Sequence, residues 1–344
     1  MLYQLSYAGP RHMRAPRFAS DNASRGAPQD GRETKGFPAP PEKLVSRRMG
    51  SFGKPMEIVY HVGAHGSDHD RIIRTLLRNR DNLWKQGIEV PAPNRYRGVL
   101  GEAVSSLKGR PAPPEMQEML LDAVMDSDQA KRLVLSQTGF LGMPNRVVSA
   151  EGLYPRSHHR LTGLSNLFPD SVVEFFIGLV HPARQIAALV RMTNGRYDAL
   201  MAGVDPRKLQ WTPLILRMLQ TMPDRDIVVW AQEDLPFTWP EVLRRMAGVA
   251  GAVPLIGEDA VLSDLLPAEP LAALNARIAA APGLSIAARR DMVEEALAGA
   301  DEAVLETPID LPGWSQDLID DLSAIYAEDL ARIAALTGVE FISA

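Results

Sequence analysis

The chain has 344 residues, of which 46% are hydrophobic and none is cysteine. This length is enough for one large domain with a substantial core, and the lack of cysteine excludes disulfides, thiolate catalysis and cysteine-ligated zinc. The net charge of −5 is uneven, because residues 1–54 carry ten basic and four acidic side chains, whereas the remainder carries 27 basic and 38 acidic ones. An acidic body argues against a nucleic-acid partner, which normally needs a basic face. No run of about 18 apolar residues occurs, so no membrane span is expected.

Residues 1–55 are rich in Pro, Gly, Arg, Ser and Ala and show no apolar period. This composition predicts a disordered basic tail, serving as an interaction arm or a targeting segment, or an upstream extension of the true start at Met49 or Met56. The tail lacks the apolar core of about 7 to 15 residues that a secretory signal needs, so we expect a cytoplasmic protein.

Apolar and β-branched runs predict buried strands, and periodic apolar positions predict the helices between them. Strands are expected at residues 58–62, 132–136, 172–180 and 226–230, with a short extended segment at 87–91. Helices are expected at residues 70–80, 116–125, 157–167, 183–192, 209–222 and 239–250. Strands that alternate with helices indicate an α/β fold with a mostly parallel sheet. From about residue 257 to residue 344, the apolar periods predict a C-terminal helical region that ends in one strand at 339–342.

The junction between the first strand and the first helix is the most informative local pattern. The apolar run ends at Gly63, a short polar loop follows, and Ile72, Ile73 and Leu76 then lie on helical spacing. A glycine turn before a helix N-terminus points backbone N–H groups and the positive end of the helix dipole at one place, which suits a phosphate group.

Four segments, taken in chain order, resemble one known family. Residues 61–73, HVGAHGSDHDRII, resemble the first loop of bacterial sulfotransferase-like proteins of the P-loop fold. The usual sequence of that loop is H-I-G-x-H-K-T-G-T-T-S-I-Q. Residues 79–91, NRDNLWKQGIEVP, are similar to the family's N-R-x-x-L-x-x-x-G-I-x-x-P. Residues 176–189 lie where the family has a strand, R-x-P and a helix, and residues 230–234 resemble a strand that ends in an acidic pair. The resemblance covers roughly residues 56–250 and implies a P-loop-like three-layer α/β domain over residues 56–344.

The resemblance implies sulfuryl transfer from PAPS to a hydroxyl group of a small molecule or glycan, without a metal. The donor's phosphosulfate would rest on backbone N–H groups and on cationic or hydroxyl side chains. The candidate cofactor-binding residues are Gly63, Gly66, Ser67, His69, Arg71, Arg74 and Arg184. The candidate catalytic residues, as general acids or bases, are His65, His181 and Glu233.

Several positions depart from the family pattern. Gly66 stands at the lysine position, Asp68 replaces the second glycine, and His69 and Asp70 occupy the paired threonine positions. Farther along the chain, the expected arginine and serine positions hold Val180 and Ala188. Carboxylates in the loop oppose the binding of a dianion. The alternative interpretation is therefore a catalytically inactive relative that kept the scaffold as a ligand- or protein-binding module.

A third hypothesis is a metal-dependent hydrolase. His65, His69 and Asp70 are of the nitrogen and oxygen ligand types that hold a divalent ion in such enzymes. Gly63 and Gly66 argue for a loop there, and a loop would not align these side chains as one helix face does. The alternative to a metal site is a purely structural role, in which an aspartate of the loop caps the following helix.

Overall fold

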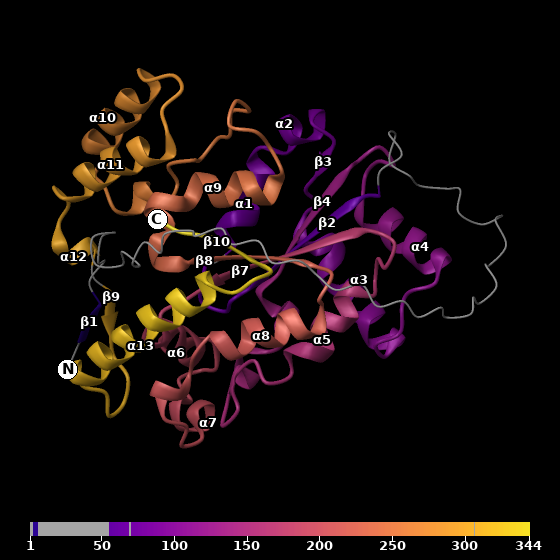
Figure 1. Cartoon of the computed structure of the whole chain (residues 1–344), viewed down its shortest axis with the longest axis horizontal. Helices are drawn as coiled ribbons and strands as arrows, with labels where there is room; N and C mark the ends of the chain where they lie inside the picture. Colours follow the sequence, from indigo (N-terminus) through magenta and orange to yellow (C-terminus); the bar gives the residue numbers. More distant parts are fainter. Residues whose placement is uncertain (1–2, 6–54, 69, 306) are drawn as a thin grey trace, which may run out of the picture.

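The computed structural model describes residues 3–5, 55–68, 70–305 and 307–344. Its centre is a six-stranded sheet in the order β10-β8-β7-β2-β4-β3, with every neighbouring pair parallel (Figure 1). The strands are β2 Glu57–Gly63, β3 Ile88–Glu89, β4 Arg132–Ser136, β7 Val172–Leu179, β8 Asp226–Ala231 and β10 Val339–Ile342. The predicted three-layer α/β fold with a parallel sheet is confirmed.

The central strand, β2, shows why the sheet strands are nearly continuous apolar runs. It pairs with β4 on one side and β7 on the other. Tyr60 and Val62 belong to the core on one face of the sheet, whereas Val59 belongs to the core on the other face. Both faces are covered, so consecutive residues are buried and mostly apolar, as is typical of parallel sheets. The exception in β2 is buried His61, whose ring Nδ1 lies 2.8 Å from the Ser136 hydroxyl of β4.

Helices form a layer on each face of the sheet (Figure 1). One core contains side chains of α3 Pro93–Leu107, α4 Pro114–Val124, α5 Ser157–Ser165, α6 Pro182–Met192, α8 Thr212–Thr221 and α13 Gln316–Ala334. The core of the opposite face contains side chains of α1 Arg71–Arg78, α2 Arg80–Lys85 and α9 Leu235–Ala247. These two layers hold the loops at the carboxyl ends of the strands in fixed positions.

The C-terminal region is helical, as predicted, and returns to the sheet. Helices α10 Ala268–Ala279 and α11 Ile286–Leu297 form a smaller core together with Phe237 of α9. After α13, strand β10 pairs with β8 at the edge of the sheet. Shorter elements include α7 Tyr197–Met201, α12 Glu302–Leu305, and the strand pairs β5 Val148–Ser149 with β6 Gly152–Leu153 and β1 Tyr3–Leu5 with β9 Thr307–Ile309.

Three differences from the sequence predictions stand out. Helix α3 was not predicted, because Gly98 and Gly101 interrupt a weak apolar period. Helix α9 begins at Leu235 rather than at residue 239 and contains Pro240 in its interior. Tyr3–Leu5, expected within the disordered tail, forms strand β1. The rest of that predicted tail, apart from residue 55, lies outside the described residues.

Within the described part of the chain, no helix combines the length and the apolar character needed to cross a bilayer.

Candidate functional site

The candidate site lies where the carboxyl ends of four neighbouring strands meet. Because β2, β4, β7 and β8 are parallel and adjacent, the loops that follow them gather at one edge of the sheet. These loops contain residues 63–70, 137–141, 180–184 and 232–234. Open α/β sheets usually bind their ligands at this edge.

His65 is buried against Tyr154 rather than open to a substrate. Its backbone N–H donates to the Tyr154 hydroxyl at 2.9 Å, its ring Nδ1 lies 3.0 Å from the same oxygen, and the two rings are stacked. The His65 side chain is only 3% exposed, and burial lowers its pKa to about 4. At neutral pH the imidazole is therefore neutral, and its contacts hold the loop in place.

The middle of the loop satisfies its own polar groups. The Ser67 hydroxyl donates to the carbonyl of Ala64 at 2.7 Å. Asp68 Oδ2 accepts from the backbone N–H of Ile72 at 2.9 Å, in the first turn of α1, as the helix-capping interpretation predicts for an aspartate of this loop. The other carboxylate oxygen of Asp68 is buried and accepts no hydrogen bond from the described residues. Asp68 thus places a negative charge where the resemblance expects a phosphate group.

The glycines of the loop have different surroundings. Gly66 has φ +82°, and a Cβ added to it would lie 2.7 Å from the Cβ of Ala188 on α6. A Cβ added to Gly63, which has φ +126°, would lie 3.5 Å from backbone atoms of Thr138 in the chain after β4, which is ordinary van der Waals contact. The loop therefore rests directly on α6, and Gly66 and Ala188, which stand where the resemblance predicts lysine and serine, face each other.

His181 and Glu233 form a cluster with Arg184 and Tyr326. Glu233 Oε1 accepts from the His181 backbone N–H at 3.1 Å and lies 3.3 Å from Arg184 Nη1. Glu233 Oε2 accepts from the Tyr326 hydroxyl at 2.9 Å. The His181 ring accepts from the N–H of Ala183 through Nδ1, and its Nε2 lies 3.1 Å from the Ser323 hydroxyl. The structure thus brings three of the predicted residues together, joined to α13.

Burial sets the protonation of this cluster. It lowers the pKa of His181 to about 3, with a further contribution from the Arg184 charge, so His181 is neutral at neutral pH. Burial, and secondly the Glu233 carboxylate, raises the pKa of the neighbouring Asp234 to about 6. A neutral histidine whose two ring nitrogens are both engaged is poorly placed to take a proton from a substrate.

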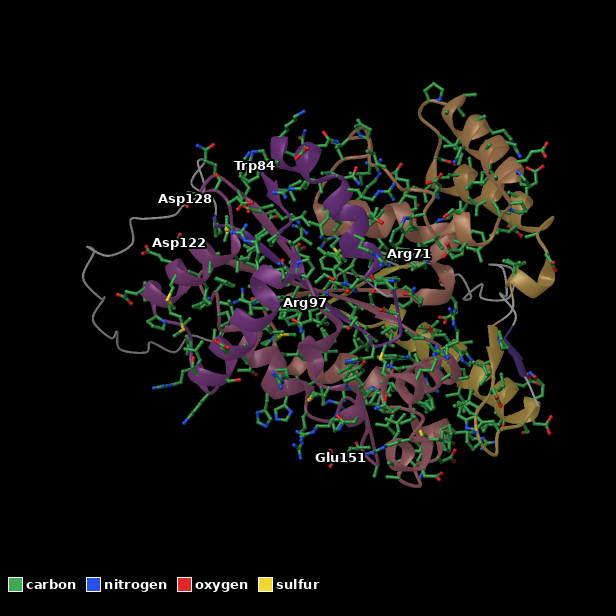
Figure 2. All side chains as sticks on the ribbon, turned by 180° about the vertical axis from the view of Figure 1, so that it is seen from behind. Arg71, Trp84, Arg97, Asp122, Asp128 and Glu151 are labelled. Carbon is green, nitrogen blue, oxygen red and sulfur yellow. The ribbon has the colours of Figure 1, made fainter. Side chains whose placement is uncertain are left out.

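The predicted cations are engaged with the protein's own groups. Arg71 is paired with Asp264 and donates to the carbonyl of Ala260 at 3.3 Å. Arg74 lies on α1 with an exposed side chain and also has a polar partner. Asp70 is paired at 2.7 Å with Arg97 of α3, a residue that no sequence motif singles out (Figure 2 labels Arg71 and Arg97). The carboxylates of the chain therefore offset much of the positive charge that a phosphosulfate would need.

The metal hypothesis finds no support in the described residues, where no group of three His, Asp or Glu side chains is placed to hold an ion. His69, a member of that hypothesis and of the predicted donor site, lies outside the described residues.

Sequence reasoning missed three residues that organise the site. Tyr154 lies after the short strand β6, and Tyr326 belongs to α13, far along the chain. Arg97 belongs to α3, which was not predicted. Lone tyrosines and arginines in such segments carry no motif, so only the folded arrangement reveals them.

A small pocket of about 60 Å³ adjoins the site between α3 and the chain after β4. It is lined by Arg97, Leu100, Gly101, Val104, Gln137, Gly139, Phe140, Arg160 and Leu164. This volume holds a few water molecules rather than a nucleotide.

Neither a protein-family model, nor a curated protein, nor a solved structure matches the chain.

Proposed function

We propose that this chain is a non-catalytic relative of the sulfotransferase-like proteins that uses their scaffold as a binding module. The observation that carries the proposal is the position of Asp68. Its carboxylate accepts from the first turn of α1, where a donor phosphate would otherwise accept. One oxygen of that carboxylate has no partner among the described residues, so its charge repels a second anion.

The rest of the site supports the same proposal. Gly66 leaves no gap toward Ala188, so the loop and α6 are in contact where a nucleotide would separate them. Glu233 is held by the backbone N–H of His181, by Arg184 and by Tyr326, which leaves it poorly placed as a general base. Sulfuryl transfer from PAPS to a small hydroxylated molecule or glycan remains the competing hypothesis, and nucleotide binding separates the two.

The test is calorimetric titration of PAP and PAPS into the full chain. We expect no saturable heat up to about 1 mM nucleotide, which corresponds to binding weaker than about 4 kcal/mol. Micromolar affinity would overturn the proposal and justify a screen of hydroxylated acceptors.

The variant Asp68→Asn tests the electrostatic argument separately. Asparagine keeps an oxygen for the Ile72 N–H and removes the charge, so PAP binding should become saturable, with a dissociation constant below about 1 mM. Asp226→Asn removes an exposed carboxylate at the opposite end of the sheet and should leave PAP affinity unchanged. Equal PAP affinity in Asp68→Asn and the native chain would show that Asp68 does not exclude the nucleotide.

A further inference from the structure

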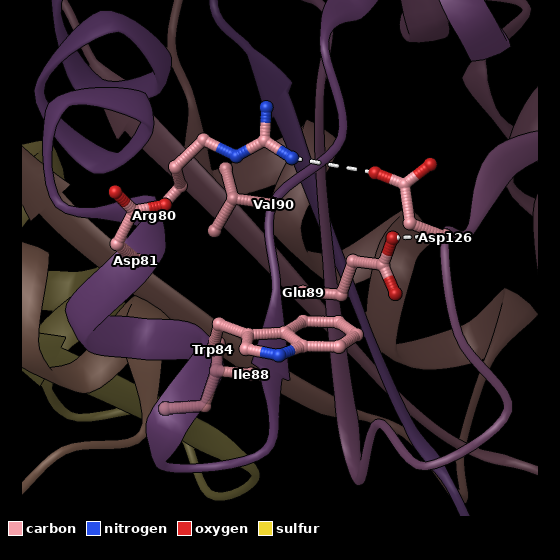
Figure 3. Close-up of a pocket in the computed structure, with 7 residues that line it drawn as sticks. All are labelled: Arg80, Asp81, Trp84, Ile88, Glu89, Val90 and Asp126. Atoms are coloured by element: carbon pink, nitrogen blue, oxygen red, sulfur yellow. Dashed lines mark hydrogen bonds and ion pairs between the residues drawn. The ribbon is translucent and has the colours of Figure 1, made fainter.

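A second pocket lies at the edge of the sheet formed by β3, away from the loops of the candidate site (Figure 3). Its volume is about 210 Å³, and it is lined by Arg80, Asp81, Trp84, Ile88, Glu89, Val90 and Asp126. Pockets for drug-sized ligands usually measure about 300 to 1,000 Å³, so this one suits a smaller molecule.

Glu89 contributes a buried carboxylate to this pocket. Glu89 is only 4% exposed, and its Oε1 accepts from the backbone N–H of Asp126 at 2.5 Å. Its Oε2 is buried and has no hydrogen-bond partner among the described residues. Burial raises the pKa of Glu89, and the Asp126 carboxylate adds to that shift, whereas the backbone N–H groups of Asp126 and Ser127 and the charge of Arg95 oppose it. A buried carboxylate oxygen without a donor is costly, and a ligand that supplies an N–H would remove that cost.

Trp84 provides an aromatic surface beside this carboxylate. It is 43% exposed, whereas the other four tryptophans, Trp211, Trp230, Trp239 and Trp314, are buried. Trp84 lies on α2, at the surface of the molecule (Figure 2). The face of an indole ring attracts cations and alkyl groups.

The arginines near the pocket are paired with Asp126 rather than with Glu89. Arg80 Nη2 lies 3.3 Å from Asp126 Oδ2, the ion pair drawn in Figure 3, and Arg95 Nη1 lies 2.5 Å from Oδ1. Among the lining residues, the acidic side chains of Asp81, Glu89 and Asp126 outnumber the single basic one. The charge of the pocket therefore favours a cation over an anion.

We propose that this pocket binds the primary ammonium group of a small organic cation. The ammonium donates one N–H to Glu89 Oε2 and lies against Trp84 with its alkyl part. The group comes either from a free amine or from a lysine side chain on a peptide, and the chemistry that recognises it is the same. This inference does not depend on the proposed function, since its residues and its probe differ from those of the nucleotide test.

The experiment titrates n-pentylammonium into the full chain, followed by calorimetry and by tryptophan fluorescence, in which Trp84 is the exposed reporter. Neutral n-pentanol and anionic pentanoate, which have similar size, are the comparison ligands. We expect saturable binding of n-pentylammonium, with affinity at least about tenfold higher than for n-pentanol, because only the cation forms a charge-assisted hydrogen bond. Equal binding of n-pentanol, preferred binding of pentanoate, or no saturation with any of the three would overturn the proposal.

Two variants locate the binding. Glu89→Gln removes the charge and should weaken n-pentylammonium binding at least about tenfold, whereas Trp84→Ala should weaken it about three- to tenfold. Asp226→Asn, which removes an exposed carboxylate on β8 that does not line the pocket, is the matched control and should change affinity less than about twofold. Unchanged affinity in Glu89→Gln, with a melting temperature no lower than that of the native chain, would contradict the assignment.

The source of the ammonium group is distinguished by N-acetyl-lysine methylamide. Tighter binding of this compound than of n-pentylammonium would indicate a lysine of a peptide partner. The reverse order would indicate a free amine.

Discussion

Two buried carboxylates, Asp68 and Glu89, share one feature and differ in their surroundings. Each has one oxygen hydrogen-bonded to a backbone N–H and one buried oxygen without a partner among the described residues. Asp68 lies in a loop that is pressed against α6, whereas Glu89 lines a pocket of about 210 Å³ beside an exposed tryptophan.

An unpartnered polar atom therefore suggests a ligand only where the structure leaves room for one. The loop after β2 carries the pattern that resembles a phosphosulfate site, yet its charge is negative and its contact with Ala188 is close. The sequence around β3 has no motif for a ligand site, yet the pocket there has an open volume, the Glu89 carboxylate and the aromatic face of Trp84. Stability measurements on the candidate site, which includes the loop and His181, and on the edge pocket test this comparison.

The largest expected effect is acid destabilisation through His181. Its folded-state pKa of about 3 lies below the unfolded value near 6.5, so the unfolded chain binds more protons between these values. Stability is therefore fully present above pH 6.5 and is lost as the pH falls toward 3, by about 3 to 5 kcal/mol for this group. Urea unfolding measured from pH 7 to pH 4 should show this loss.

The matched variant for this experiment is His181→Asn, which keeps a side-chain acceptor for the Ala183 N–H but cannot titrate. Its stability should fall less steeply with acid than that of the native chain. Asp234 contributes with the opposite sign, because its raised pKa of about 6 costs stability as the pH rises, but it is common to both proteins. Parallel curves for the two proteins would contradict the neutral, buried state of His181.

Much of the fold follows from the sequence because the sheet strands are short apolar runs. The predicted strand at residues 132–136 agrees with β4, and those at 172–180 and 226–230 agree with β7 and β8 to within one residue. Helix α3 escaped prediction because its tertiary contacts, such as buried Tyr96 and Leu100, offset two glycines that weaken its pattern.

The candidate site was less predictable than the fold. The position of Glu233 at the end of β8 follows from strand pattern, but its partner Tyr326 is 93 residues away in sequence. Likewise, Asp70 finds Arg97 on a helix that carried no strong signal. Sequence spacing places residues on an element, whereas long-range pairing depends on how the elements pack, so the donor-site resemblance could not show that its charges are internally paired.

The second prediction concerns the loop after β2, which lies against α6. Gly66→Ala places a Cβ against Ala188 in a left-handed backbone conformation, so it should destabilise the protein by about 2 to 5 kcal/mol. Gly109→Ala is a control with the same φ of +82° and no atom within 4 Å of the added Cβ, so it should cost only about 1 to 2 kcal/mol. Denaturant unfolding gives both values. Equal losses in the two variants would mean that the loop is not pressed against α6.

The smallest effect is expected at the edge pocket, where Glu89→Gln tests whether the free carboxylate costs stability. Its pKa is raised in the folded chain, mainly by burial, so its charge is disfavoured above that pKa, and the glutamine should stabilise the protein at pH 8 by up to about 1 kcal/mol. The gain should shrink at pH 4, where the carboxyl is protonated.

Glu174→Gln is the matched contrast, because Arg132 and Arg245 hold that buried carboxylate with a lowered pKa. That substitution should destabilise by about 1 to 3 kcal/mol. A loss of stability in Glu89→Gln as large as that in Glu174→Gln would mean that Glu89 has a partner in the folded protein, and the pocket would then have no oxygen to offer an ammonium group.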